Sequence, residues 1–423
     1  MKITVVTQYF PPEMAATGRR AQDLAASLAG AGHRVTVIAG RPNHPASLGR
    51  FFSRRAARRE TTPEGYVVLR VPVFRSSDAR PRKRLLNYLT FLLAAAWKGI
   101  VLPRPDVVVA ISPLPAGLAA LAIHGWHRAP LIYDLQDIWP DSARAVGVMA
   151  ESPALRLLRR CERLLYRCCA RVVAISCGFR RYLEGLGVPP GRIAVIENGV
   201  EFDRFAGARP EARLRRAGAL RGRFVVGYIG NLGLAQGLDT LLESARHLRR
   251  EPVSFLLIGE GVERQRLERR AREEGLGGVR FMRGVPRRRV PGMLAACDAL
   301  VVMLREDPLF EITIPSKLYE YMAAGKPVLC AVGGEAAALV ARAGCGLGVR
   351  PSDGAALATG VRDLMASPAA SRDMGEAGAR WVSQHASRAA LMRAYAEVLC
   401  DAAEHRARPV IEPEPVSSEA ALL

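Results

Sequence analysis

The stretch IPSKLYEYMAAGKP, residues 314–327, says more about the fold than any other part of this sequence. It predicts a short helix, because a proline followed by Ser316 suits a first helical turn and Gly325 suits a helix end. Lys317 and Glu320 are three residues apart, so they share one face of that helix. Helix N–H groups and a lysine favour a phosphate, and a carboxylate one turn later can accept two ribose hydroxyls. The stretch therefore predicts a nucleotide-diphosphate site; the alternative is a capped surface helix with an ordinary Lys–Glu pair.

Lysine is rare in this chain. There are five lysines among 61 basic residues, and two of the five, Lys317 and Lys326, lie in this stretch. A sequence that uses arginine almost everywhere has kept lysine twice within ten residues. This favours the functional interpretation of the stretch over the structural one.

The length of 423 residues is large for one core and indicates two domains. The net charge of +21 suits nucleic acid, an anionic membrane surface or phosphorylated substrates, and equally an arginine-rich composition. No nucleic-acid-binding motif is present and aromatic residues make up only 6% of the chain, so no nucleic-acid partner is expected.

The eight cysteines form no C-x-x-C pair, and no histidine cluster completes a zinc site. They predict reduced thiols in a cytoplasmic protein, without a bound metal. Residues 3–6 begin a strand directly, which predicts that no signal peptide is present.

Residues 1–39 alternate as strand, loop, helix and strand, which predicts a parallel sheet. Ligands of such sheets bind beyond the carboxyl ends of the strands, where the loop 8–20 lies. In this loop Gly18 would allow the backbone to approach a substrate, and Arg19 or Arg20 would pair with phosphate. No G-x-G-x-x-G motif is present, so the fingerprint of a nicotinamide cofactor is missing.

Three carboxylates crowd the end of a predicted strand at 131–135, namely Asp134, Asp137 and Asp141. Loops at that edge usually carry the chemistry of an α/β protein, which favours a functional role for Asp137. Asp141 with Ser142 instead suits a helix cap.

A basic cluster at 80–84 precedes the apolar segment 85–97, which contains Tyr88 and Trp97. This pattern is typical of a helix that lies in a membrane interface. The segment is too short and too interrupted to predict a transmembrane span. The alternative is a crossover helix buried against the sheet.

The segment 201–222 has no clear strand and predicts a linker, after which the strand–loop–helix pattern restarts at 224. A glycine-rich loop at 230–237 follows the first strand of this half, and such a loop before a helix can hold phosphate. The tail 406–423 is rich in Pro, Glu and Ser and is expected to be disordered.

Several of these motifs run through nearly the whole chain in order: Tyr9–Glu13, Gly32–Val37, Tyr133–Ser142, Glu197–Val200, Gly230–Gly233 and Pro315–Pro327. In this arrangement the chain resembles the family-4 retaining glycosyltransferases of the GT-B type. Within that family it is similar to the branch that builds bacterial surface polysaccharides.

The resemblance implies an α/β protein of the GT-B class, with two Rossmann-like domains whose parallel sheets face a cleft. The expected parts are an acceptor-side domain at 1–203, a nucleotide-sugar-binding domain at 204–385 and a helix at 386–405 that crosses back to the first domain. The implied reaction is retaining transfer of a hexosyl or N-acetylhexosaminyl group from a nucleotide-diphosphate sugar, with UDP the expected nucleotide, to a lipid-linked saccharide. No cofactor is expected. The protein would be cytoplasmic, and peripheral binding to an anionic membrane surface stays open.

Site residues follow from the same resemblance. Glu320 matches the family glutamate that holds the donor ribose, and Ser316 and Lys317 lie where the helix start meets the diphosphate. Gly18 matches the first-domain glycine near the transferred sugar. The expected donor-binding set is completed by Arg19, Gly230, Asn231, Gln236 and Arg305.

The sequence departs from the family pattern on the donor side. The first glutamate of the E-x7-E pattern would stand at position 312, which is Ile312, and Glu311 is the nearest substitute. Asn231 and Gln236 replace the usual basic pair of the glycine loop. Lys317, with Arg305 or Arg19, would then have to neutralise the diphosphate.

A second departure concerns the acceptor side. A histidine that often follows the strand 106–111 is absent, since Ile111 stands there. Asp137 is then the nearest candidate for orienting or deprotonating an acceptor hydroxyl. With Glu311 and Lys317 it forms the expected catalytic set.

Two other functions stay open from the sequence. A nucleotide-sugar epimerase on the same fold would interconvert free nucleotide sugars without an acceptor. A non-catalytic protein that binds nucleotide sugars or a membrane surface is compatible with the altered E-x7-E pattern.

Overall fold

The computed structural model describes residues 1–13, 15–42, 58–74, 81–211, 214 and 220–404. The expected tail at 406–423 lies outside these residues. Residues 43–57, part of the linker 201–222 and Arg80 of the basic cluster also lie outside them.

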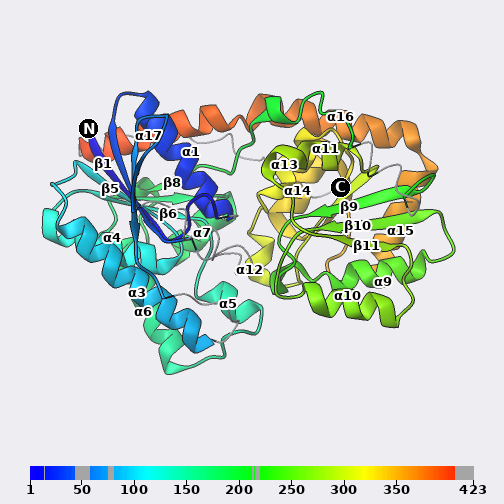
Figure 1. The fold of residues 1–423 in the computed structure, drawn as a ribbon, viewed down its shortest axis with the longest axis horizontal. Helices are drawn as coiled ribbons and strands as arrows, with labels where there is room; N and C mark the ends of the chain where they lie inside the picture. The colour runs from blue at the N-terminus through cyan, green and yellow to red at the C-terminus, as the bar shows by residue number, and fades with distance from the viewer. Residues whose placement is uncertain (14, 43–57, 75–80, 212–213, 215–219, 405–423) are drawn as a thin grey trace. The chain divides into compact units, whose positions relative to one another are not determined.

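The chain folds into two compact units. Unit 1 comprises Met1–Pro140, Glu151–Glu197 and the chain from Met392 onward, and unit 2 comprises Asp141–Ala150 and Asn198–Leu391. Each unit has a sheet covered by helices (Figure 1). The expected α/β class is therefore confirmed.

Unit 1 is built on a sheet with the strand order β3-β4-β2-β1-β5-β6-β7-β8 among the described residues. All neighbours pair in parallel except the short β3, which runs antiparallel to β4. Central strands are continuous apolar runs, as parallel strands covered on both faces require. Their bounds are β1 Lys2–Thr7, β2 Arg34–Gly40, β3 Arg59–Thr61, β4 Val67–Val71, β5 Val107–Ile111, β6 Leu131–Leu135, β7 Arg171–Ala174 and β8 Ile193–Val195.

Helices cover both faces of this sheet. Figure 1 shows α3, α4 and α6 on one face and α1 on the other, as right-handed crossovers require when the strand order reverses beside β1. The helices of unit 1 are α1 Ala16–Gly30, α3 Pro81–Ile100, α4 Leu114–His127, α6 Pro153–Cys168 and α7 Cys177–Gly185, with the 3-10 turn η1 Pro190–Arg192.

Unit 2 has an all-parallel sheet in the order β11-β10-β9-β12-β13-β14 among the described residues. Its strands are β9 Phe224–Ile229, β10 Val253–Ile258, β11 Val279–Met282, β12 Ala299–Met303, β13 Val328–Ala331 and β14 Gly346–Gly348. Its helices are α5 Asp141–Ala145, α9 Asp239–His247, α10 Arg264–Glu273, α11 Val290–Ala295, α12 Pro308–Glu311, α13 Lys317–Ala323, α14 Gly334–Ala343, α15 Gly354–Ala366 and α16 Pro368–His385, with the 3-10 turns η2 Phe202–Arg204, η3 Leu234–Gln236 and η4 Arg287–Arg289.

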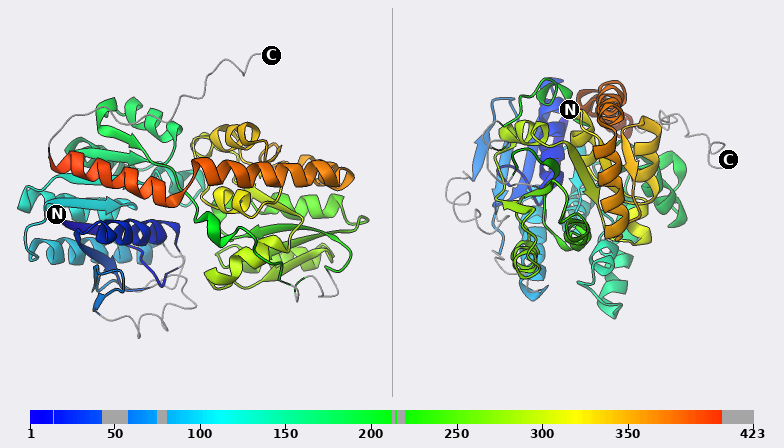
Figure 2. Two further views of the ribbon diagram at one scale, coloured as in Figure 1. Left: turned by 90° about the horizontal axis from the view of Figure 1, so that it is seen from above. Right: turned by 90° about the vertical axis from the view of Figure 1, so that its right-hand side faces the viewer.

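The last helix, α17 (Arg388–Ala403), belongs to both units, because the division falls at Met392. Figure 2 shows its red ribbon along unit 1. Tyr395 and Leu399 on this helix are fully buried, and Asp401 forms an ion pair with Arg171 at 3.4 Å. The part of α17 after Met392 is thus an integral piece of unit 1.

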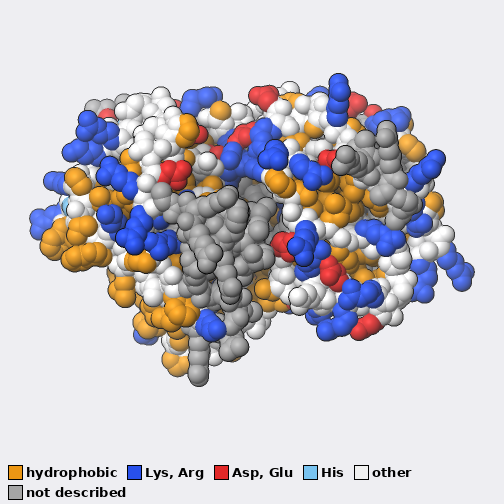
Figure 3. All heavy atoms as spheres, viewed as in Figure 1, with side chains coloured by type: hydrophobic (Ala, Val, Ile, Leu, Met, Phe, Trp, Pro, Cys, Tyr) orange, Lys and Arg blue, Asp and Glu red, His pale blue; other side chains and the backbone are white. Residues whose placement is uncertain are grey.

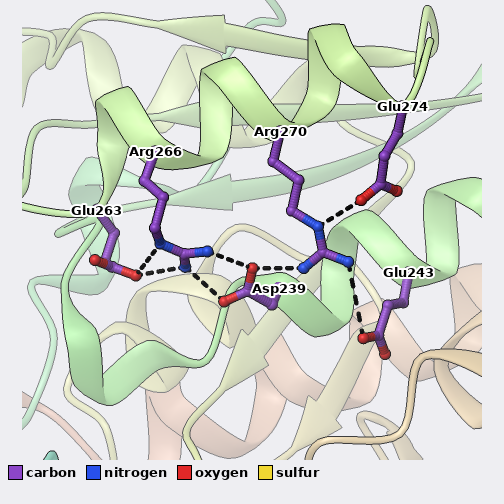
Figure 4. Close-up of polar contacts among 6 residues, drawn as sticks. All are labelled: Asp239, Glu243, Glu263, Arg266, Arg270 and Glu274. Carbon is purple, nitrogen blue, oxygen red and sulfur yellow. Dashed lines mark hydrogen bonds and ion pairs between the residues drawn. The ribbon is translucent and has the colours of Figure 1, made fainter.

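Helices α9 and α10 of unit 2 are joined by a cluster of ion pairs (Figure 4). Asp239 accepts hydrogen bonds from Arg266 and Arg270, and Arg266 also contacts Glu263. These hydrogen bonds, above all those from Arg266, hold the pKa of Asp239 below its usual value. Arg266 and Arg270 are therefore engaged within the fold.

The structure differs from the sequence-based expectation in several elements. Helix α1 begins at Ala16, so Gly18 and Arg19 lie in its first turns instead of in a loop. Helices α15 and α16 and strand β3 were not anticipated. A short helix begins at Asp141, where a helix cap was one interpretation.

Helix α3 is longer than the expected 85–97 and packs against the sheet with one face, as the crossover interpretation predicts, while contact with a membrane stays a prediction. One face is buried, with Phe91 and Ala95 inaccessible. The other face exposes large apolar side chains, among them Leu93 and Trp97. No helix of the described part of the chain is long and apolar enough to cross a membrane.

Candidate donor and acceptor sites

The glycine-rich loop of unit 2 begins at the carboxyl end of β9 and is packed tightly against the loop that follows β10. Gly230 has a φ of 152° and its N–H donates to the Ile258 carbonyl at 2.9 Å. A Cβ on Gly259 would lie 1.8 Å from the Gly230 oxygen, so only glycine fits there. The loop is thereby held at the edge where α/β proteins bind their ligands.

Lys317 extends from the first turn of α13 to this loop. Its Nζ donates to Tyr228 Oη at 2.6 Å and lies 4.0 Å from the centre of the Tyr228 ring. Burial lowers the pKa of Lys317 to about 7, although Glu320 acts to raise it. An anion bound here would restore the charge on the lysine.

Tyr228, near the carboxyl end of β9, connects the lysine with the loop. Its hydroxyl accepts from Lys317 and donates to the Asn231 carbonyl at 2.7 Å. Burial raises the pKa of this hydroxyl, which keeps it protonated and able to donate. No motif in the sequence singles out Tyr228, because a tyrosine within an apolar strand looks like core; its place two residues before Gly230 is the only signal.

Arg305 is the second cation at the loop. It follows β12, its backbone N–H donates to Ala235 O at 2.9 Å, and a Cβ on Gly237 would lie 3.2 Å from its Cγ. Among the residues that the structure describes, its guanidinium forms no ion pair or hydrogen bond. The loop 230–237 is therefore bordered by Lys317 and Arg305.

Asn231 and Gln236, expected to bind the donor, shape the loop. Gln236 Oε1 accepts from the Gly233 N–H at 3.1 Å. The Asn231 side chain is exposed and would clash with any Cβ on Gly233. Gln236 thus has a structural role, while the Asn231 amide is accessible to a ligand.

The remaining expected donor residues lie on α12 and α13. Ser316 precedes α13 without a capping side-chain hydrogen bond. The Glu320 carboxylate makes no hydrogen bond or ion pair with any described residue. Glu311 is exposed at the end of α12, and its side chain lies over Gly333 at the start of α14. All three side chains are available to a ligand.

Gly18 and Arg19 belong to unit 1. A Cβ on Gly18 would lie 2.9 Å from the Tyr9 oxygen, so this glycine lets α1 pack against the Tyr9–Phe10 backbone. Arg19 forms an ion pair with Asp23 at 2.9 Å and donates to Gln22. Arg19 is thus engaged on its own helix and is a weaker candidate for phosphate than Arg305.

Arg20, the other arginine considered for phosphate, is buried and has a structural role. Its Nε donates to Asp134 Oδ2 at 2.7 Å. Its two terminal nitrogens donate to the carbonyls of Ile196 and Glu197 at 2.8 and 2.9 Å. The guanidinium also lies over the ring of Tyr395 in α17. Asp134 is therefore a partner of Arg20 inside the fold.

Asp137 is exposed beyond β6. It interacts electrostatically with Arg84 at the start of α3, and Arg84 Nε donates to Tyr88 Oη at 2.8 Å. Tyr88 packs edge-on against Trp139 with ring centres 5.7 Å apart. A carboxylate, a cation and two aromatic rings meet here, a combination suited to a saccharide. The sequence had signalled Asp137 but not Arg84 or Tyr88 as its neighbours.

No cluster of three potential metal ligands occurs in the described ranges of the chain. No disulfide is formed among the eight cysteines, of which Cys169, Cys297, Cys330 and Cys345 are buried. The expectation of catalysis without a metal stays a prediction.

Comparison with known proteins identifies the family. Residues 16–199 match the model described as "Glycosyl transferase 4-like domain", and residues 211–381 match "Glycosyl transferases group 1". The chain belongs to the family-4 glycosyltransferases. The first match ends close to the point where the chain passes from unit 1 to unit 2 after Glu197, and the second match lies within unit 2. Together the two matches cover most of the glycosyltransferase.

Two curated relatives and one solved structure illustrate the likeness. The glycosyltransferase is 27% identical to WcaI of Escherichia coli (strain K12), named for colanic acid biosynthesis, over 77% of this chain and 82% of that one. It is 29% identical to WbjE of Pseudomonas aeruginosa, over 54% of this chain, and that match spans only 58% of WbjE. HepE of Anabaena in complex with UDP superposes with a TM-score of 0.70 at 19% identity, over 95% of this chain and 100% of that one. This places the glycosyltransferase in the GT-B fold class.

Proposed function

We propose that this glycosyltransferase transfers a hexosyl or N-acetylhexosaminyl group from a UDP-sugar to a lipid-linked saccharide, with retention of configuration, in the synthesis of a cell-surface polysaccharide. The donor would bind unit 2 and the acceptor unit 1. The names of WcaI and the UDP complex of HepE support the pathway and the nucleotide.

One observation carries the donor assignment. Lys317 and Arg305 border a glycine-rich loop that is held at the carboxyl end of β9 by close packing against the loop after β10. Two cations at such a loop suit a diphosphate. Glu320, three residues after Lys317 and without a protein partner among the described residues, would accept hydrogen bonds from the ribose.

The chemistry needs positive charge where the leaving group forms. The bond between the anomeric carbon and the diphosphate oxygen breaks, and Lys317 and Arg305 stabilise the charge that develops on the departing UDP. The acceptor oxygen bonds to the anomeric carbon on the same face. Asp137 orients or deprotonates that hydroxyl, and Glu311 stands on the donor side as the substitute for the missing glutamate at 312.

Purified protein incubated with a panel of nucleotide sugars, with and without a polyprenyl-diphosphate-linked saccharide, tests the proposal. We expect release of nucleotide diphosphate that depends on the acceptor, with a product heavier by one sugar. Lys317→Ala and Glu320→Ala should each lower kcat/KM for the donor at least tenfold, because each removes a charge-assisted contact of roughly 1.5–3 kcal/mol. Arg249→Ala, an exposed change elsewhere in unit 2, is the matched control.

Other outcomes would identify the alternatives. An isomerised nucleotide sugar without acceptor would establish an epimerase. Tight nucleotide binding without turnover across the whole panel, in variants and wild type alike, would contradict the transferase proposal and favour a binding protein.

A further inference from the structure

Two arginines of this arginine-rich chain differ from the others because they are buried. Figure 3 shows blue Lys and Arg side chains over much of the visible face of the molecule. Among the described residues, only Arg20 and Arg70 are buried, with 5% and 6% exposed. Arg20 has the carboxylate of Asp134 as its partner. Arg70 forms no ion pair with any described residue, so its burial has another reason.

Arg70, in β4, holds the loop that follows β1, residues 9–13. One terminal nitrogen of its guanidinium donates to the carbonyls of Phe10 and Gly40 at 3.4 Å each, and the other donates to the Pro11 carbonyl. The guanidinium also lies over the Phe10 ring, 5.4 Å from its centre. A planar group with several donors is needed to hold three carbonyls in this way.

Glu13 closes the same loop from within. It is 5% exposed, its N–H donates to the Phe10 carbonyl at 3.2 Å, and its carboxylate accepts from the Phe10 N–H at 3.4 Å. Burial lowers the pKa of Arg70, and the Glu13 carboxylate acts to raise it. The loop therefore carries a buried charge opposite to that of the arginine that holds it.

This arrangement is not the most stable one available to the chain. Arg70 Nε is buried and makes no hydrogen bond with any described residue. An unpaired buried donor is destabilising, and apolar residues in place of two buried charges are often at least as stable. Local rules of this kind are broken mainly at functional sites. The position of the loop is therefore expected to matter for function.

The loop contacts the group of residues that surrounds Asp137, here called the acceptor-side cluster. Its members are Arg84, Tyr88, Asp137 and Trp139. Burial raises the pKa of Tyr9 well above its usual value, and a hydrogen bond to Tyr88 adds to this, so Tyr9 stays protonated and donates. Tyr88 Oη also accepts from Arg84. Tyr9 is thus the side chain that connects the loop with the cluster.

The backbone of Tyr9 is fixed as well. Thr7 Oγ1 donates to the Tyr9 carbonyl at 3.0 Å, and the same oxygen would lie 2.9 Å from a Cβ on Gly18. The loop is thereby held by β1 and α1 on one side of Tyr9 and by Arg70 on the other. Its tyrosine has little freedom to leave Tyr88.

We infer that Arg70 and Glu13 position the acceptor-side cluster by fixing this loop, with Tyr9 as the connecting side chain. Neither residue would touch the acceptor. Binding is stronger when the contacting groups are ordered beforehand, so loss of this support should raise the KM for the acceptor. The inference rests on the proposed function for the meaning of the cluster, whereas the order of the cluster can be measured without turnover.

The fluorescence of Trp139 tests that order without a ligand. Trp139 is kept in the full chain and the other three tryptophans are replaced: Trp97→Phe, Trp126→Phe and Trp381→Phe. Arg70→Met/Glu13→Gln then removes both charges and keeps an oxygen that accepts from the Phe10 N–H. Because Trp139 loses the support of Tyr88, its quenching constant with acrylamide should rise at least about twofold.

Kinetics separate positioning from stability. With the polyprenyl-diphosphate-linked saccharide that supports turnover, Arg70→Met/Glu13→Gln should raise the acceptor KM about tenfold. UDP affinity, measured by calorimetry, should stay unchanged because the proposed donor site lies in unit 2. The free energy of unfolding should stay close to that of wild type, since no uncompensated charge is left buried.

Tyr9→Phe tests whether Arg70 acts through Tyr9. The change keeps the ring and removes the donor to Tyr88, which should raise the acceptor KM about five- to tenfold. Combined with Arg70→Met/Glu13→Gln it should add little, giving about tenfold in total instead of about fiftyfold or more.

Arg223→Met is the matched control. Arg223 also holds backbone carbonyls, those of Val253 and Glu251 at 2.7 and 3.0 Å, but at the amino end of β10, away from the ligand-binding edge. It should lower stability and leave the acceptor KM and the quenching of Trp139 unchanged. Should Arg70→Met/Glu13→Gln not fold, Arg70→Lys replaces it. A single ammonium group keeps the charge but cannot hold three carbonyls, so quenching and KM should move in the same direction.

Three results would overturn the inference. These are wild-type quenching of Trp139 in Arg70→Met/Glu13→Gln, an equal rise of the acceptor KM in Arg223→Met, or effects of Tyr9→Phe that multiply with those of the double variant. Failure of the proposed function is recognised separately. It gives no turnover with any variant, while the quenching of Trp139 still rises when Arg70 and Glu13 are replaced.

Discussion

At the scale of single residues, the donor half of the site depends on a lysine whose charge is not fixed. Lys317 is partly removed from water and faces the hydroxyl and ring of Tyr228, and it forms no ion pair with any residue that the structure describes. Desolvation disfavours the ammonium form. We therefore expect Lys317 to gain a proton when an anion binds. This proton uptake can be measured.

Nucleotide-diphosphate binding should take up protons above neutral pH. In the free protein Lys317 has a pKa of about 7 and is largely neutral at pH 8. A bound diphosphate stabilises the charged form and raises that pKa, so affinity should fall as pH rises above 7, by up to about tenfold per pH unit. Calorimetry of UDP binding at pH 8 in two buffers of different ionisation enthalpy measures the uptake, expected to approach one proton.

Lys317→Arg is the control for this titration, because arginine stays charged at pH 8. It should bind UDP without proton uptake and with a flat pH profile. An affinity of the wild-type protein that does not change between pH 6 and 9 would contradict the assigned role of Lys317.

Tyr228→Phe tests the residue that positions the lysine. The change keeps the ring and removes the hydroxyl that accepts from Lys317 and donates to the Asn231 carbonyl. Loss of these two hydrogen bonds should weaken UDP binding by about 1–2 kcal/mol, or roughly five- to thirtyfold. The KM for the donor should rise more than kcat falls.

The pH dependence of proton uptake in Tyr228→Phe distinguishes a role in positioning Lys317 from a general loss of stability. With phenylalanine the lysine loses its hydrogen-bond acceptor, so the midpoint of the proton uptake should move relative to wild type. Destabilisation without any movement of that midpoint would indicate that Tyr228 only fills space in β9.

At the scale of elements, loops of unit 2 approach one another through glycines. Gly259 has a φ of 159° and lies against Gly230, and a Cβ on Gly261 would lie 2.1 Å from the Leu232 oxygen. These contacts fix the ends of β9 and β10, from which the loop 230–237 extends. The geometry of the loop is thus a property of two neighbouring strands.

Gly259→Ala should disturb the fold and the donor site together. The new Cβ would lie 1.8 Å from the Gly230 oxygen, so the two loops must separate. We expect a loss of at least about 2 kcal/mol in the free energy of unfolding and weaker UDP binding. Urea unfolding and calorimetry measure both. Gly277→Ala, where a Cβ has open space, is the matched control and should leave both unchanged.

Elements with a strong local signal were predicted well. The strand at 224–229 has the expected bounds because an uninterrupted apolar run in a parallel sheet has few other solutions. Helices α15 and α16 were not predicted because their alanine- and glycine-rich sequences show only a weak hydrophobic periodicity. The N-cap of α15 was a signal in the sequence, since the Asp353 carboxylate accepts a hydrogen bond from the Ala356 N–H at 2.8 Å. In the site, Lys317 and the glycine loop were found from local motifs. The Arg20–Asp134 pair spans 114 positions, a separation that no local pattern reports.

At the scale of the whole molecule, two of the four places where the chain passes between the units, after Glu197 and after Leu391, are fixed in similar ways. In unit 1, Arg20 binds the carbonyls of Ile196 and Glu197. In unit 2, Val200 N donates to Ala386 O at 2.9 Å, and Arg388 donates to the Gly199 carbonyl at 2.7 Å. Both passages are thus held by hydrogen bonds close to the point of crossing.

Arg20→Met should be among the most destabilising substitutions in unit 1. It would leave the Asp134 carboxylate buried without its cation, which costs about 3–5 kcal/mol. Arg20→Met/Asp134→Leu removes the charge as well and should recover most of the loss. Urea unfolding of the two variants provides the comparison, and a double variant no more stable than the single one would show that the backbone carbonyls of Ile196 and Glu197 are the main partners.

The way α17 completes unit 1 has a consequence for synthesis of the chain on the ribosome. Tyr395 and Leu399 are fully buried in a unit whose other strands and helices all precede residue 198. When those earlier elements have emerged, the place of α17 is still empty, and unit 2 must be translated before it can be filled. The first part of the protein to be made is therefore among the last to be finished, and a nascent chain stalled before residue 392 should expose the apolar surface that Tyr395 and Leu399 later cover.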